Sequence, residues 1–143
     1  METQKIVVEV CEKVLTSLAE THQKEAQNIR LRIDVETIKS KPVFGVFDQK
    51  TFICHQTLNE IINHGGGKGM GLIIGMYLKN IIRDLFSGFT KHLNENDTKN
   101  IFIILHFKTI GEISQPVLSI YQLGKLIDSI AVGEIIDLQN QQK

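Results

Sequence analysis

The spacing of apolar residues along the chain changes several times, and each change marks a new element. From Val7 to Leu18 apolar residues recur at helical spacing, which predicts an amphipathic helix over residues 4–26. From Ile29 to Val35 they alternate with charged residues, which is typical of a strand with one buried face. Two further strands are predicted at residues 43–47 and 51–54.

The second half begins with helical signals and ends with strand signals. Thr57 and Glu60 have the spacing of a capping box, so a short helix should begin there and stop at His64. A longer helix is predicted over residues 70–93, with an apolar stripe from Ile74 to Phe89. Three strands and a last helical turn should follow, at residues 101–107, 117–122, 126–132 and 134–138.

Some of these later elements carry specific expectations. The run from Ile101 to Phe107 is apolar without interruption, which predicts a central strand buried on both faces. Pro116 should stand before the next strand, and Gly124 should turn the chain back into a hairpin.

This order of elements predicts an α+β fold: a mostly antiparallel sheet of about six strands with helices packed on one face, in the order α-β-β-β-α-α-β-β-β-short α. With 143 residues the chain fits one domain and one core. We expect the domain to span residues 1–138 and a polar tail to cover 139–143.

A glycine-rich turn between the two middle helices is the one unusual segment. Glycines allow backbone N–H groups to approach a ligand, and the N-terminus of the following helix favours an anion. The turn does not match the P-loop pattern, because Lys68 is followed by Gly69, and the dinucleotide pattern fails at every offset. The residues that would bind a nucleotide or another phosphate are His64, Gly65, Gly66, Gly67, Lys68, Gly69 and Gly71.

The same glycines also support a structural interpretation, which we favour. Gly65 would be a helix C-cap, and Gly67, Gly71 and Gly75 stand four apart, so they leave one bare helical face for close packing. The first two turns of the helix, Met70 to Leu78, are apolar nearly all round and must be covered, by the sheet or by a second chain. The predicted interface residues are Gly71, Ile73, Gly75, Met76 and Tyr77.

Cysteines and histidines indicate neither a metal site nor a catalytic group. No pair has the spacing of a zinc site, so we expect no metal and no cofactor. Cys54 and His55 are adjacent, but neighbours on a strand point to opposite faces, which disfavours a nucleophile and base. His106 is expected to be a hydrogen-bonded structural residue, and Cys11 and Cys54 small buried side chains.

Composition and charge narrow the classes of partner that the chain is expected to bind. The 16 basic and 16 acidic residues cancel, so nucleic acid or an anionic membrane could be bound only through a local patch, and we expect neither. Two cysteines make no disulfide framework, and the N-terminus lacks the pattern of a signal peptide. These features predict a soluble cytoplasmic protein.

Two classes of function follow. The first is a non-catalytic interaction or adaptor module that forms a homodimer or a larger assembly and docks a protein partner. The second is a small-ligand sensor or enzyme that binds a nucleotide or other anion at residues 64–71, in a neighbourhood rich in basic residues. Those basic residues are His64, Lys68, Lys79, Arg83, Lys91 and His92.

Overall fold

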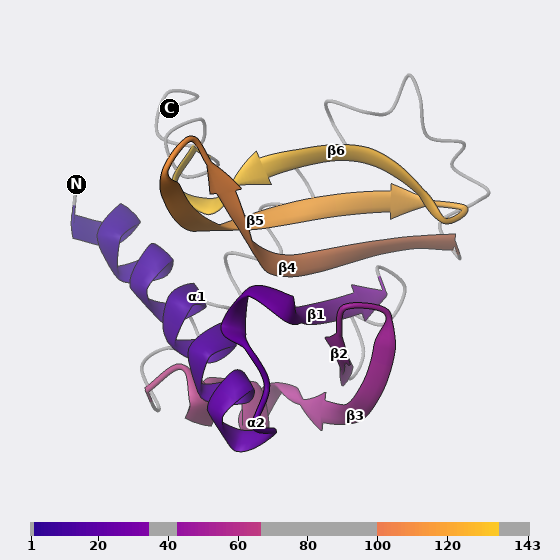
Figure 1. Ribbon diagram of the computed structural model, residues 1–143, viewed down its shortest axis with the longest axis horizontal. Coiled ribbons are helices and arrows are strands. Elements are labelled where there is room, and N and C mark those ends of the chain that lie inside the picture. The colour runs from indigo at the N-terminus through magenta and orange to yellow at the C-terminus, as the bar shows by residue number, and fades with distance from the viewer. Residues whose placement is uncertain (1, 35–42, 67–99, 135–143) are drawn as a thin grey trace.

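A computed structural model of the chain describes residues 2–34, 43–66 and 100–134 (Figure 1). Its elements are α1 (Glu2–Thr21), η1 (Ala26–Asn28), β1 (Ile29–Asp34), β2 (Val43–Asp48), β3 (Thr51–Thr57), α2 (Leu58–His64), β4 (Ile101–Ile110), β5 (Ile113–Gln122) and β6 (Lys125–Ala131). Residues 132–134 are helical. The predicted fold class and order of elements are confirmed; the helix expected over residues 70–93 lies outside the described residues.

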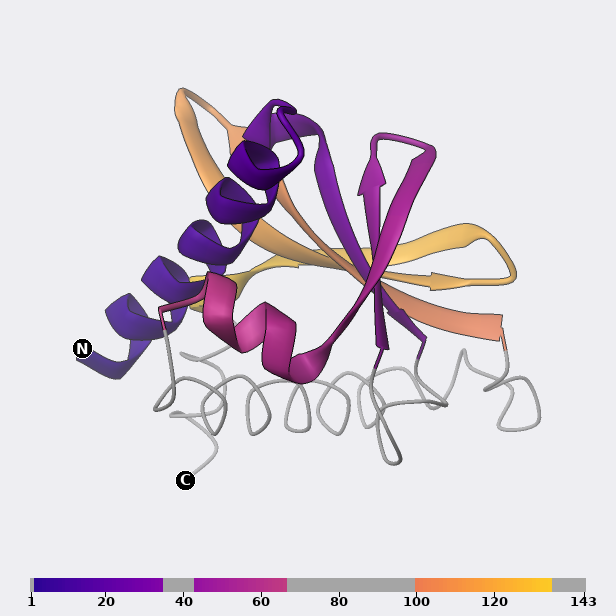
Figure 2. The same cartoon turned by 90° about the horizontal axis from the view of Figure 1, so that it is seen from below.

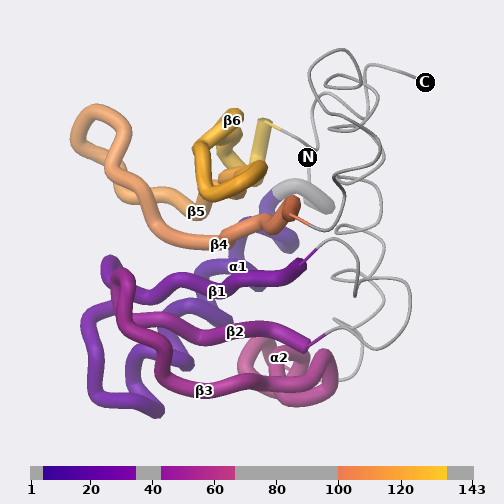
Figure 3. Tube along the Cα trace, turned by 90° about the vertical axis from the view of Figure 1, so that its right-hand side faces the viewer, coloured from indigo at the N-terminus to yellow at the C-terminus, as the bar shows by residue number. Residues whose placement is uncertain are grey.

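The six strands form one antiparallel sheet in the order β3-β2-β1-β4-β5-β6. Two three-stranded meanders, β1 to β3 and β4 to β6, are joined where β1 pairs with β4. Figure 3 shows the strands side by side, with α1 behind them. The first strand of each meander is therefore central, and β3 and β6 are the edges.

Both helices lie on one side of the twisted sheet (Figure 2). The alternation of β1 directs Ile29, Leu31 and Ile33 to this side, where all three are buried. The core there is made of large apolar side chains, all but one of them aliphatic: Val7, Val10, Val14, Leu15, Leu18, Phe44, Val46, Ile61, Ile101, Ile103, Leu118 and Ile120. Helix α1 contributes five of these side chains, in agreement with its amphipathic pattern.

Helix α1 ends at Thr21, five residues before the end that the sequence predicts. Gln23 adopts a left-handed backbone with φ of 57°, and Lys24 N–H donates to Ala19 O at 2.8 Å. This hydrogen bond closes the last turn in the way of a Schellman motif, although the left-handed residue is usually glycine. Among the helices of residues 2–34, 43–66 and 100–134, none is long and apolar enough to cross a membrane.

Two expectations for the second meander are corrected. Strand β4 is central and its inward side chains Ile101 and Ile103 are buried, but its outward side chains Phe102 and Ile104 are only half-buried. Strand β5 begins at Ile113, so Pro116 lies within the strand, opposite Phe107. The β4–β5 hairpin extends past the rest of the sheet, so β5 begins before Pro116.

Candidate functional site

The glycine-rich turn begins at the C-terminal end of α2. A capping box fixes where this helix begins. Thr57 Oγ1 accepts a hydrogen bond from Glu60 N–H at 3.3 Å, and Glu60 Oε1 accepts one from Thr57 N–H at 3.1 Å. Gly65 is the C-cap, as expected, and its N–H donates to Ile61 O and Ile62 O. Gly66 follows with φ of +108°, a conformation that favours glycine.

Gly65 also allows α2 to approach α1 closely. A Cβ at this position would lie 3.1 Å from Val10 Cγ1 and 3.1 Å from Val14 Cγ2. Both valines are buried and stiff in a helix, so they could make room only by a shift of backbone or rotamer. Gly65 thus serves packing as well as capping.

His64 is held by α1 rather than directed at solvent. Its Nδ1 lies 2.7 Å from Ser17 Oγ. Burial, together with the nearby His22, lowers the pKa of the His64 imidazole, so the ring is neutral at pH 7. A neutral imidazole at the C-terminal, negative end of α2 attracts an anion only weakly. This part of the predicted anion site, His64, Gly65 and Gly66, therefore offers an anion little electrostatic attraction.

The remaining residues predicted for the anion site, namely Gly67, Lys68, Gly69 and Gly71, lie outside the described residues. So do all five predicted interface residues: Gly71, Ile73, Gly75, Met76 and Tyr77. Both interpretations of these positions stay hypotheses.

Cys54 is paired with a histidine that the sequence did not indicate. His55 lies on the opposite face of β3, and Cys54 Sγ instead lies 3.7 Å from Nε2 of His22, at the end of α1. Cys54 is half-buried rather than buried, which corrects the expectation. Burial and the charge of Glu60 raise the pKa of the thiol, so it is protonated at neutral pH.

His106 is the centre of a hydrogen-bonded chain across three strands. Its Nε2 lies 2.8 Å from Ser119 Oγ, which lies 2.7 Å from Ser129 Oγ. Its Nδ1 lies 3.1 Å from Phe107 O, which assigns the proton to Nδ1 and makes Nε2 an acceptor. Ser119 is 2% exposed, so no substrate can reach its hydroxyl in this conformation. The expected structural role of His106 agrees with these contacts.

Within the described ranges, no three histidine, cysteine or acidic side chains are grouped so that they could hold a metal ion. The Cys54–His22 pair and the His106 chain therefore offer neither a metal centre nor an accessible nucleophile. The functional surface of the described chain is to be sought elsewhere.

The sheet side away from α1 and α2, on which Val117 and Ser119 of β5 are nevertheless buried, is called the open face from here on and carries most of the aromatic side chains of the described residues. Of six in the described residues, Phe44 and Phe107 face the helices, and the register places the other four on the open face. These four are Phe47, Phe52, Phe102 and Tyr121.

A stacked row crosses three strands of the open face. Arg32 Cζ of β1 lies 3.8 Å from the centroid of the Phe102 ring of β4. The Phe102 ring stacks on Tyr121 of β5, with centroids 5.0 Å apart and planes 10° from parallel. Arg32 also donates to Asp34 Oδ1 at 3.0 Å, which fixes the guanidinium beside the ring.

A second aromatic group lies on β2 and β3. The Phe47 ring meets Phe52 edge to face, at 5.4 Å between centroids, and Phe52 tilts against His55 at 4.7 Å. Gly45 makes this possible, because a Cβ there would lie 2.9 Å from Cε1 of Phe47. Phe52 is 47% exposed, although it is among the largest apolar side chains of the chain.

Sequence reasoning missed this surface. The outward position of Phe47 and Phe52 depends on the register of β2 with β3, and the Phe102–Tyr121 stack depends on the register of β4 with β5. The signal that could have found them is the period of two, which gives Phe102 and Tyr121 opposite phases to the core residues Ile101, Ile103 and Ile120.

Comparison of the chain with protein-family models, with curated proteins and with solved structures finds no match.

Proposed function

We propose that this domain is a non-catalytic interaction module that self-associates and docks a protein partner. The observation that supports it is the open face, where four aromatic side chains and two arginines stand on the side of the sheet away from the core. Protein interfaces are enriched in aromatic residues and arginine and depleted in lysine and acids.

The chemistry of the described residues agrees with this proposal. The thiol of Cys54 is protonated, and the hydroxyl of Ser119 is buried. A nucleophile needs the opposite properties, a lowered pKa or an adjacent base together with access to substrate.

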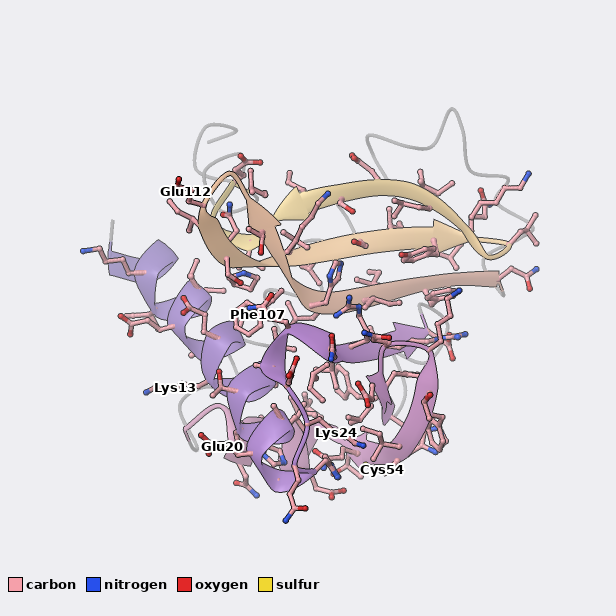
Figure 4. The ribbon with its side chains drawn as sticks, viewed as in Figure 1. Lys13, Glu20, Lys24, Cys54, Phe107 and Glu112 are labelled. Carbon is pink, nitrogen blue, oxygen red and sulfur yellow. The ribbon has the colours of Figure 1, made fainter. Side chains whose placement is uncertain are left out.

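Self-association is supported by exposed apolar side chains at the ends of the second meander. Ile110 and Ile113 at the β4–β5 turn are 48% and 68% exposed, and Leu123 and Leu126 at the β5–β6 turn are 63% and 55% exposed. Figure 4 shows Glu112 at the tip of the β4–β5 hairpin. Exposed apolar side chains that are neighbours, such as Ile110 and Ile113, which pair across the hairpin, mark interaction sites more often than lone apolar residues do.

Light scattering coupled to size exclusion tests the proposal at micromolar concentration. We expect a mass of at least twice the 16.2 kDa of the chain. A single species of 16.2 kDa at every concentration would contradict self-association.

A further inference from the structure

The open face carries an excess of positive charge in a chain whose net charge is zero. Of the strand residues that the structure describes, the register places three cations on it, Arg30, Arg32 and Lys108, against the single carboxylate of Asp34. Arg32 is paired with Asp34 at 3.0 Å. Arg30 and Lys108 form no ion pair with a carboxylate within the described ranges.

Arg30 is the more informative of the two. Its Nη1 donates to Gln27 O at 2.8 Å and to Ile29 O at 3.1 Å, so the guanidinium is fixed at the start of β1. Burial lowers the pKa of Arg30, the nearby Tyr121 opposes this in part, and no carboxylate of the described ranges forms an ion pair with it. A carboxylate from outside would restore that lost stabilisation, and charge-assisted hydrogen bonds of this kind are strong.

The apolar part of the surface favours a protein over a nucleic acid. Proteins that bind single-stranded nucleic acid stack its bases on aromatic rings whose faces are free. The Phe102 ring is already stacked with Arg32 and Tyr121, and the Phe47 ring lies against Gly45 and Phe52. Ring edges and the exposed aliphatic side chain of Val43 suit contacts with aliphatic side chains instead.

We propose that the open face binds an acidic segment of a partner protein, whose apolar side chains pack against Phe52, Phe102 and Tyr121 while its carboxylates meet Arg30 and Lys108. This inference rests on the proposed function, since it names the partner of the interaction module. It assigns docking to the middle of the open face, and it leaves self-association to the apolar side chains at the β4–β5 and β5–β6 turns.

The test uses the full chain and a random dodecapeptide library displayed on phage. Selection on the immobilised chain should enrich peptides that combine Asp or Glu with Leu, Ile, Val or Phe. The synthetic consensus peptide is then measured by fluorescence polarisation against a matched pair of charge reversals. Lys108→Glu lies on the open face, and Lys13→Glu lies on the outside of α1, where its side chain points away from the sheet (Figure 4). Both residues are exposed, so neither change should unfold the chain.

We expect Lys108→Glu to weaken peptide binding about tenfold or more and Lys13→Glu to change it less than about twofold. Phe52→Ala should weaken binding as well, and added salt should do so in the wild type. Peptides without acids, no enrichment, or equal effects of the two reversals would each overturn the inference. Binding of oligothymidylate to the open face in place of the peptide would overturn it in favour of a nucleic acid.

Light scattering on the same variants separates this inference from the proposed function. A self-associating chain that selects no acidic peptide leaves the proposed function standing and removes the inference. Loss of self-association in Lys108→Glu would assign the open face to a second copy of the chain and also overturn it. A monomer that binds the acidic peptide would remove self-association and keep the docking surface.

Discussion

Cys54 Sγ lies 3.7 Å from His22 Nε2, although His55 is its neighbour in sequence. A thiol beside an imidazole suggests a reactive cysteine, but burial and the charge of Glu60 act in the opposite direction and raise its pKa. The partner of a thiol matters less here than the charge and solvent around the pair.

We therefore predict slow alkylation of Cys54 by iodoacetamide at neutral pH, with a rate that rises only at more alkaline pH than for an unperturbed cysteine. Glu60→Gln should shift this profile to lower pH, because it removes the second cause of the raised pKa. Cys11 is the internal control: burial raises its pKa to about 12, so it should not react in the folded chain. Mass spectrometry of each cysteine peptide gives both rates. Rapid labelling of Cys54 at pH 7 would contradict the prediction.

The packing of α2 on α1 predicts that Gly65→Ala destabilises the fold. Its methyl group would overpack Val10 and Val14 and should cost about 1–3 kcal/mol in urea unfolding. Gly66→Ala is the matched control, since nothing lies within 4 Å and the cost, about 1 kcal/mol, comes from the positive φ alone. In a Val14→Ala background, only the cost of Gly65→Ala should fall. Equal costs in both backgrounds would show that packing is not the cause.

Local patterns predicted the elements well, and long-range pairing accounts for what they missed. The capping box of Thr57 and Glu60 and the alternation of β1 involve residues within one element, so the sequence displays them directly. The contact of Arg32 with Phe102 requires β1 to pair with β4, and no local pattern specifies which strands become neighbours. The same holds for His22 and Cys54, which only the packing of α1 beside β3 brings together.

The Arg32–Phe102 contact predicts an energetic coupling across the two strands. A double-mutant cycle of Arg32→Leu and Phe102→Leu should give a coupling free energy of about 0.5–1 kcal/mol, as expected for an exposed cation–π pair. Arg32→Lys should retain the charge and lose part of the coupling, because only the planar guanidinium stacks on the ring. A coupling of zero in urea unfolding would mean that the stacked row is not formed in solution.

Burial and the charges of Arg30 and Lys108 lower the pKa of His106, and this makes stability depend on pH. A lowered pKa means that the unfolded chain binds the proton more tightly, so stability is complete above the unfolded pKa and falls as the pH drops through the folded one. We expect the free energy of unfolding to decrease between about pH 7 and pH 5. His64, whose pKa is also lowered, adds to the same trend. His106→Asn should make the free energy of unfolding depend less on pH, and the double variant His106→Asn with His64→Asn should reduce this dependence further. An unchanged slope in both variants would contradict this assignment.

The last prediction separates the two hypotheses for the glycine-rich turn. If Gly71 and Gly75 form a bare helical face for close packing, alanine at either position should lower the melting temperature and weaken self-association. Overpacking costs about 1–3 kcal/mol, and the better helix propensity of alanine returns at most about 1 kcal/mol of it. Lys68→Ala should then change neither property, because a solvated lysine has no part in packing. An anion site predicts the reverse: Lys68→Ala should abolish a thermal shift caused by nucleotides or phosphate esters, while alanine at Gly71 and Gly75 is tolerated.

The described start of the turn favours the first result, since Gly65 serves both as the cap of α2 and as the point where α2 meets α1. A glycine that is used for close approach at residue 65 gives a physical reason to expect the same use a few residues later.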